Sequence, residues 1–167
     1  MTSACADEGW LAGVSLAPMR RGDVPQVVAI ERLSFPTAWT AESYLRELRN
    51  PSSYYVVARQ GQELVGYAGM WILSGEAHIS TLAVHPSFRR RGLGRLLLRH
   101  LLAAARERGA ARATLEVRES NHAAQALYES CGFQAAGRLH KYYADTGEHG
   151  VLMCRPLAAG EGEGGDE

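Results

Sequence analysis

The sequence has few of the features that mark secreted, zinc-binding or membrane proteins. It contains three cysteines, Cys5, Cys131 and Cys154, and none is spaced as a CxxC pair. An odd count without that spacing argues against a disulfide framework and against a zinc site. No apolar run approaches the roughly 20 residues of a membrane-spanning helix. The first residues also lack the basic region and long apolar stretch of a signal peptide.

The chain has no excess charge of either sign. Its 18 Lys and Arg residues balance 18 Asp and Glu residues, for a formal net charge of zero. A broad cationic surface for nucleic acid or for a membrane is therefore not expected. We expect a cytoplasmic enzyme with no metal, no direct nucleic-acid partner and no membrane partner. The sequence leaves the oligomeric state open and is compatible with a monomer.

One stretch, from Leu82 to Arg95, differs from this even background. A β-prone run ends at Val84, a turn with Pro86 follows, and a helical pattern begins near Gly92. Apolar residues then recur at the spacing of one helix face, namely Leu93, Leu96, Leu97, Leu101 and Ala105. Gly109 is a suitable stop for that helix. The stretch therefore predicts a strand, a basic glycine loop and a helix.

The chemistry of this junction favours an anion. The first N–H groups of a helix have no partner inside it, and the helix dipole adds partial positive charge there. Gly92 and Gly94 let a ligand approach the backbone closely. Four arginines flank them, Arg89, Arg90, Arg91 and Arg95, and their forked donors suit phosphate oxygens. A Walker loop is excluded because no Lys-Ser/Thr pair follows, and the three-glycine dinucleotide motif is absent. The simpler alternative is a tight turn with a solvated arginine run.

The sequence predicts seven strands, of which residues 54–59 and 63–73 show a period of two. The strands cover residues 14–19, 54–59, 63–73, 77–84, 113–117, 133–139 and 149–155. A hairpin meander comes first and a strand-helix-strand crossover follows, which predicts a mixed sheet with helices on both faces. The predicted domain spans residues 14–157, with a flexible tail at 1–13 and a disordered acidic tail at 158–167.

Three further helices are predicted from their capping residues. Asp23, with Gln26 as a capping-box partner, precedes a helix that ends near Ser34. Its expected buried face consists of Val27, Val28, Ile30 and Leu33. Thr40 caps a second helix that continues through Arg49, and Asn121 caps a third that ends at Ser130.

Three residues after the glycine loop are candidates for the chemistry of a site, and two of them, Glu116 and Tyr128, can transfer protons. Glu116 is an acid within the apolar run Thr114–Val117, Tyr128 lies on an apolar helix stripe, and Asn121 precedes that helix. Each also has a purely structural interpretation, as an exposed strand residue, a core residue and an N-cap respectively.

The glycine loop resembles the pyrophosphate loop of the GNAT superfamily, the GCN5-related N-acetyltransferases. Their pattern Arg/Gln-x-x-Gly-x-Gly/Ala is matched by Arg89, Gly92 and Gly94, preceded by the run Ile79–Pro86. The stretch Leu115–Phe133 is similar to the RimI branch, the bacterial N-terminal alanine acetyltransferases of ribosomal proteins. Supporting similarities lie at Phe35–Trp39, Glu31, Tyr142, Tyr143, Gly147 and Glu148.

The resemblance implies an α/β fold with a mixed, mostly antiparallel central sheet of about seven strands. It implies acetyl-CoA as cosubstrate, bound by Leu82, Ala83, Val84, Arg89, Arg90, Arg91, Gly92, Leu93, Gly94, Arg95 and Asn121. It further implies that Glu116 accepts the amine proton and that Tyr128 protonates the leaving thiolate. Glu76 and His78, on the strand before the loop, are alternative bases, because some members of the superfamily use that strand for proton transfer. The implied acceptor is the N-terminal alanine of small-subunit ribosomal protein number eighteen, and Trp39, Tyr142 and Tyr143 are expected to line its groove.

The acceptor assignment has alternatives, because the sequence departs from the branch near that groove. Ala38 stands where the branch usually has Pro, and His149-Gly150 where it usually has Asp-Ala. A lysine side chain, a small-molecule amine, or a non-catalytic acyl-CoA-binding role are the competing interpretations. Two physical arguments favour an α-amine on a protein. A single carboxylate suits its lower pKa, and no acidic cluster for a polycation stands out.

Overall fold

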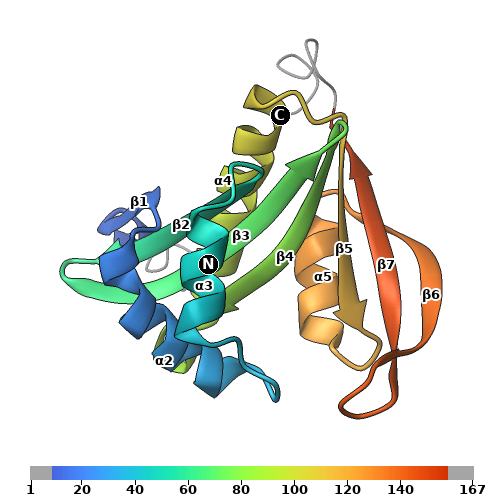
Figure 1. Cartoon of the computed structure of the whole chain (residues 1–167), viewed down its shortest axis with the longest axis horizontal. Helices are drawn as coiled ribbons and strands as arrows, with labels where there is room; N and C mark the ends of the chain where they lie inside the picture. The colour runs from blue at the N-terminus through green and yellow to red at the C-terminus, as the bar shows by residue number, and fades with distance from the viewer. Residues whose placement is uncertain (1–8, 158–167) are drawn as a thin grey trace. The chain divides into compact units, whose positions relative to one another are not determined.

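The computed structural model describes residues 9–157, which form an α/β structure with a seven-stranded mixed sheet (Figure 1). The strand order is β1-β2-β3-β4-β5-β7-β6. The strands are β1 Val14–Pro18, β2 Ser53–Gln60, β3 Glu63–Leu73, β4 Glu76–Val84, β5 Arg112–Arg118, β6 Gln134–Tyr143 and β7 Glu148–Pro156. β4 and β5 pair in parallel, whereas β1–β2, β5–β7 and β6–β7 are antiparallel. The predicted fold class is confirmed.

Besides the helical residues 9–11, four helices and two short 3₁₀ turns lie within the described residues 9–157. The helices are α2 Val24–Ser34, α3 Ala41–Leu48, α4 Leu93–Glu107 and α5 His122–Ser130, and the turns are η1 Arg21–Asp23 and η2 Pro86–Phe88. No helix within residues 9–157 is long and apolar enough to cross a membrane. The chain divides into two compact units. The first holds the residues up to Met70 with Thr81–Leu101, and the second holds Trp71–Ser80 with the residues from Leu102 onward.

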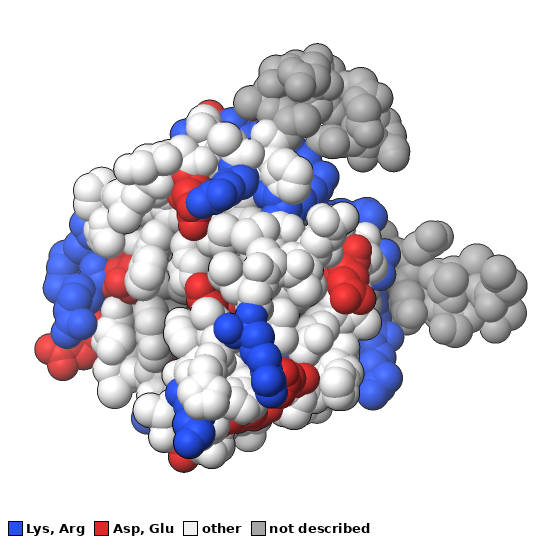
Figure 2. Space-filling view, turned by 90° about the vertical axis from the view of Figure 1, so that its right-hand side faces the viewer, with Lys and Arg blue, Asp and Glu red and all other residues white. Residues whose placement is uncertain are grey.

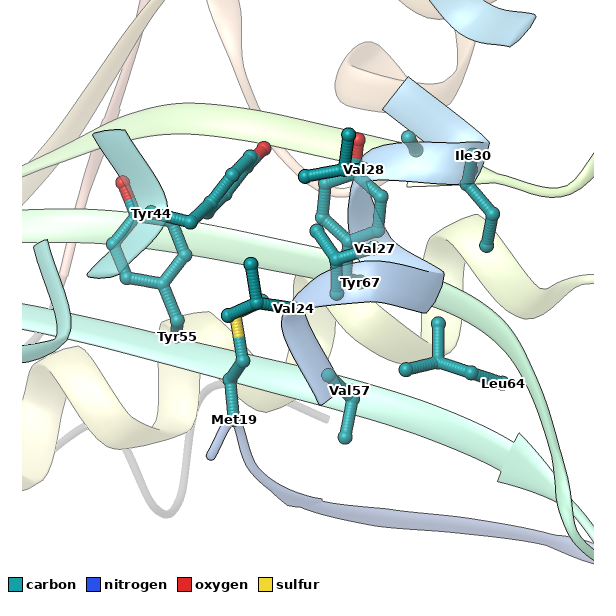
Figure 3. Packing of buried hydrophobic residues seen from close by; sticks show 11 residues of the cluster. Met19, Val24, Val27, Val28, Ile30, Tyr44, Tyr55, Val57, Leu64 and Tyr67 are labelled. Atoms are coloured by element: carbon teal, nitrogen blue, oxygen red, sulfur yellow. The ribbon is translucent and has the colours of Figure 1, made fainter. Parts of the chain in front are cut away.

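Helices cover both faces of the sheet in the first unit. On one face, α2 and α3 pack on β2 and β3 through a cluster that includes Val24, Val27, Val28, Ile30, Tyr44, Tyr55, Val57 and Tyr67 (Figure 3). On the other face, a Cβ added to Gly66 would lie 3.2 Å from Leu97 Cδ1 and 3.3 Å from Leu93 Cδ2. Neighbouring strand residues point to opposite faces, so Gly66 leaves room for α4 while Tyr67 packs beneath α2.

The second unit is built around β5. Its strand pairs in parallel with the first residues of β4 and along its whole length with β7, from Arg112↔Pro156 to Arg118↔Gly150. Leu115, Phe133 and Met153 are fully buried there.

On the face shown in Figure 2, basic and acidic side chains are interspersed rather than gathered by sign. That face therefore presents no continuous cationic surface.

The structure corrects three details of the sequence-based expectations. The Asp23–Gln26 capping box is wrong, because Asp23 makes no side-chain cap to α2 and binds the N–H of Arg20 and the guanidinium of Arg59 instead. Leu33 is 60% exposed, and Glu31 takes its place in the buried face. On α4, Leu96 is only partly buried and Leu98 is fully buried.

The predicted tails fall largely outside the described residues. Residues 1–8 and 158–167 are not described, so the expected disorder there stays a prediction. Within the predicted tail 1–13, residues 9–11 are helical and Trp10 stacks on Phe88.

Candidate active site

The glycine loop is tied to the end of β4 by backbone and side-chain hydrogen bonds. The N–H of His85 donates to the carbonyl oxygen of Val65 (2.8 Å), and the His85 Nδ1 accepts from the N–H of Ser87 (3.0 Å), which caps η2. Arg89 Nε donates to the carbonyl oxygen of Val84 (2.9 Å). Arg89 also donates from Nη2 to the hydroxyl of Ser34 (3.3 Å). The loop is therefore folded back onto the strand that leads into it.

The loop leaves the first amides of α4 available to a ligand. Gly92 has φ +86°, a left-handed conformation in which a side chain would be strained. The N–H of Leu96 makes a helical hydrogen bond to Gly92 O (3.1 Å), so the amides of residues 93–95 precede the helical hydrogen-bond ladder. The side chains of Arg90 and Arg95 are exposed. These features suit the phosphate oxygens of a nucleotide-containing donor.

The three predicted donor-binding residues of β4 differ in exposure. Ala83 is buried at 5% exposure, while Leu82 and Val84 are partly buried. The carbonyl oxygen of Val84 is engaged by Arg89. That bond uses one of the two lone pairs of the Val84 carbonyl oxygen.

In the second unit, Glu116 lies against His78. The two residues come from the neighbouring strands β5 and β4, and Glu116 Oε1 is 2.7 Å from His78 Nε2. The ring of Trp71 covers the imidazole, with centroids 5.6 Å apart. The hydrogen bond to Glu116 raises the pKa of His78, against the opposing effect of burial. The sequence offered these two residues as alternative bases, and the structure joins them.

Glu76 has a different environment from Glu116. Its carboxylate accepts two hydrogen bonds from Arg112 (3.0 and 2.8 Å) and one from the hydroxyl of Thr114 (2.9 Å). The hydrogen bonds from Arg112 lower its pKa. A carboxylate whose oxygens are engaged in this way is a poor proton acceptor. The structure therefore argues against Glu76 as the base.

Tyr128 and Asn121 occupy α5 and its N-terminus. Burial raises the pKa of Tyr128 to about 12, and its ring meets Phe133 edge-on at 6.0 Å. Asn121 Oδ1 accepts from the N–H of Ala124 (3.1 Å), so the predicted N-cap is confirmed. The cap engages the side-chain oxygen of Asn121, and its backbone N–H donates to Arg118 O (3.0 Å), so its side-chain amide nitrogen is the better group for binding a donor.

Two of the three predicted acceptor residues lie at the end of β6. Tyr142 and Tyr143 meet edge-on with ring centroids 5.0 Å apart, and Tyr142 is 50% exposed. The guanidinium of Arg118 lies 4.2 Å from the centroid of the Tyr143 ring and pairs with Asp145 (2.8 Å). Burial and the nearby charge of Glu116 raise the pKa of Tyr142. Arg118, which sequence analysis did not single out, thus orders this end of the hairpin.

Trp39, the third predicted acceptor residue, belongs to the first unit. Its backbone N–H donates to Glu31 Oε2 (3.0 Å), and its ring packs on Tyr44 with centroids 5.2 Å apart. Sequence analysis noted Glu31 only as part of a family resemblance. The carboxylate of Glu31 thus ties the segment before α3 to α2.

Comparison with known proteins identifies the family. The model of the acetyltransferase (GNAT) family matches residues 24–133. The chain belongs to the GNAT acetyltransferases. The N-alpha-acetyltransferase RimI of Mycobacterium tuberculosis is 38% identical over 148 residues, covering 85% of this chain and 92% of that protein. The ribosomal protein bS18-alanine N-acetyltransferase of Escherichia coli is 32% identical over 146 residues, covering 86% and 98%.

A solved structure supports the same assignment. The crystal structure of the ribosomal-protein-S18-alanine N-acetyltransferase from Escherichia coli aligns with a TM-score of 0.81 at 32% identity, covering 89% of this chain and 97% of that one. This GNAT protein is accordingly an N-acetyltransferase of a family that uses acetyl-CoA. Among residues 9–157, no group of three or more His, Cys, Asp or Glu residues is arranged to hold a metal ion.

Proposed function

We propose that this GNAT enzyme acetylates protein N-terminal α-amines, with the N-terminal alanine of ribosomal protein bS18 as its acceptor in the cytoplasm. The names of its relatives in Mycobacterium tuberculosis and Escherichia coli support this acceptor. The hydrogen bond between Glu116 and His78 is the observation that carries the proposal. It supplies a proton acceptor without a metal, and such an acceptor suits an α-amine, whose pKa is about 7.7–8.0, better than a lysine at about 10.4.

In the proposed reaction, Glu116 and His78 act together on the acceptor. The amine nitrogen attacks the thioester carbonyl carbon and loses its proton to Glu116. His78 can then take up that proton, because the hydrogen bond to Glu116 raises its pKa. The C–S bond then breaks and coenzyme A leaves as a thiolate.

Tyr128 is proposed to act on the leaving sulfur. A free thiol has a pKa of about 8.5, whereas burial raises the pKa of Tyr128 to about 12. The pKa values of the two groups therefore differ more than those of an exposed tyrosine and a thiol would. Tyr128 stabilises the developing thiolate first by donating a hydrogen bond, and proton transfer follows as negative charge builds on sulfur.

The proposed donor-binding residues are the glycine loop with Arg90 and Arg95, the strand end Leu82–Val84, and Asn121. The exposed arginines and the helix amides of residues 93–95 would receive the phosphate groups of acetyl-CoA. For the acceptor, we propose Trp39, Tyr142 and Tyr143 as the aromatic residues that contact the N-terminus of the acceptor protein.

A peptide assay read by mass spectrometry tests the acceptor. The enzyme is offered acetyl-CoA with an Ala-initiated bS18 peptide, the same peptide with a blocked α-amine, and a version that begins with a bulky residue. We expect acetylation at the free alanine, little on the bulky version and none on the blocked peptide. Acetylation of lysines in the blocked peptide at a rate comparable to the free N-terminus would refute the assignment, and would favour lysine acetylation instead.

A further inference from the structure

The N-terminal segment of the described chain lies against the glycine loop. Residues 9–11 are helical, and the N–H of Gly13 donates to Trp10 O (3.1 Å), which closes the segment before β1 begins. The Trp10 ring stacks on Phe88 of η2, with centroids 5.7 Å apart and planes 24° from parallel. A residue that precedes the first strand thus packs on the turn before Gly92.

Arg91 lies over both of these rings. Its Cζ atom is 5.2 Å from the ring centroid of Trp10 and 5.7 Å from that of Phe88. Both distances fall within the range of cation–π attraction. Such contacts use the flat face of a guanidinium, whereas its N–H donors point outward in the plane. Two aromatic rings therefore hold the Arg91 guanidinium beside the loop.

Arg89 shows the opposite arrangement. Its Nε and Nη2 atoms donate to Val84 O and to the Ser34 hydroxyl. A guanidinium engaged in this way fixes the loop but has fewer donors left for an oxygen ligand. Of these two arginines, Arg91 is thus the better candidate to receive a phosphate oxygen.

The segment also touches the loop at a second point. A Cβ placed on Gly92 would lie 3.3 Å from Leu11 Cδ1. Gly92 has a left-handed backbone, and Leu11 packs beside it. Trp10 and Leu11 therefore contact the loop at Phe88, Arg91 and Gly92, the stretch whose conformation decides where the first amides of α4 point.

We propose that Trp10 is a positioning residue for the acyl donor, holding Arg91 in the orientation that receives the pyrophosphate of acetyl-CoA. This inference rests on the proposed function of the loop. A flexible arginine loses conformational freedom when it binds a ligand, and ordering it beforehand reduces that loss. The segment before β1 is then a working part of the donor site, although it precedes the residues that the family model matches.

The test is a double-mutant cycle read by calorimetry of acetyl-CoA binding. Trp10→Ala should weaken binding about three- to tenfold, the scale of one or two lost cation–π and stacking contacts. Trp10→Phe should restore most of the affinity, because it keeps an aromatic face. In an Arg91→Ala background, Trp10→Ala should have little further effect. Leu73→Ala, which truncates another partly exposed apolar residue (62% exposed), serves as a control that should leave affinity unchanged.

A second measurement separates positioning from general loosening of the fold. S-acetyl-pantetheine carries the thioester but no pyrophosphate, so Trp10→Ala should lower kcat/KM for acetyl-CoA but not for this shorter donor. An equal loss with both donors, or an equal effect of Trp10→Ala with and without Arg91, would overturn the proposal. If Gly92→Glu leaves acetyl-CoA binding intact, the proposed donor loop itself is wrong. If Gly92→Glu abolishes binding and Trp10→Ala does nothing, only the role of Trp10 is wrong.

Discussion

Removing the carboxylate of Glu31 should destabilise the protein strongly. Glu31 is only 4% exposed and accepts hydrogen bonds from the hydroxyls of Tyr44 (2.7 Å) and Tyr67 and from the N–H of Trp39 (3.0 Å). The two tyrosines are 1% and 0% exposed. Burial and the adjacent charge of Glu31 raise the pKa values of both phenols, so both remain protonated donors across the accessible pH range.

The expected loss follows from counting the donors that Glu31→Ala leaves without an acceptor. Each buried, unsatisfied donor costs about 1–3 kcal/mol, so the two phenols together account for about 2–6 kcal/mol. Trp39 is only partly buried, so its backbone N–H can donate a hydrogen bond to water instead. Glu31→Gln keeps one acceptor oxygen and the side-chain volume, so it should cost less, about 1–3 kcal/mol.

Urea denaturation followed by circular dichroism measures these losses. Glu63→Ala removes an exposed carboxylate from the start of β3 and should change stability by no more than about 0.5 kcal/mol. Adding Tyr44→Phe and Tyr67→Phe to Glu31→Ala should recover part of the loss, because the orphaned hydroxyls are then gone. The reasoning fails if Glu31→Ala is no more destabilising than Glu63→Ala, or if the added phenylalanines lower stability further.

Three further predictions concern the proposed donor loop and the proposed catalytic residues. Gly92→Glu should reduce acetyl-CoA affinity, measured by calorimetry, at least tenfold, because it places negative charge and backbone strain in the loop. The circular dichroism spectrum should stay native. Unchanged affinity would contradict the proposed donor site. Glu116→Gln and Tyr128→Phe should each lower kcat by about 10²–10⁴-fold with the acetyl-CoA Kd nearly unchanged, and full activity of either variant would remove it from the mechanism. By NMR, the pKa of His78 should lie above its ordinary value and fall in Glu116→Gln. Because the pKa of His78 is raised in the folded state, the stability that this pair contributes should be complete below about pH 6.5. That stability should be lost as the pH rises through the raised pKa. A gain in stability over the same pH range would refute this prediction.

Helix ends set by local chemistry could be predicted from the sequence. Thr40 accepts from the N–H of Ser43 and Asn121 from that of Ala124, as their positions before helical patterns indicate. Asp23 failed the same test, because Arg59, which is distant in sequence, binds its carboxylate (2.5 Å). A cap signal holds only while no partner from another element competes for the side chain.

The buried face of α2 shows a second limit. Periodicity ranks residues by hydrophobicity, and so it favoured Leu33 over Glu31. The structure buries Glu31 because Tyr44 on α3 and Tyr67 on β3 supply its donors. No window of sequence contains that set of partners. A charged residue at a buried position becomes predictable only when the elements that satisfy it are placed together.

The pairing of Glu116 with His78 has the same origin. Each residue was recognised as a possible base, but their contact depends on the parallel register of β4 and β5, in which His78 stands opposite Thr114. Alternate residues of a strand share a face, so Glu116, two residues beyond Thr114, lies on the same side as that register position. The crossover that sets the register spans the whole of α4, and residue spacing alone does not determine it.

The arginines of the glycine loop show why a charge run cannot be interpreted as a unit. In sequence, Arg89, Arg90 and Arg91 are equivalent cations before a glycine. In the structure, Arg89 donates hydrogen bonds to Val84 O and to the hydroxyl of Ser34. Arg90 has φ +65° at the turn, and Arg91 lies over two aromatic rings. Substituting each in turn should therefore separate loop folding at Arg89, a combined effect on the turn and on phosphate binding at Arg90, and phosphate binding at Arg91. The partners that distinguish them come from α2 and from the segment before β1, and neither adjoins the loop in sequence.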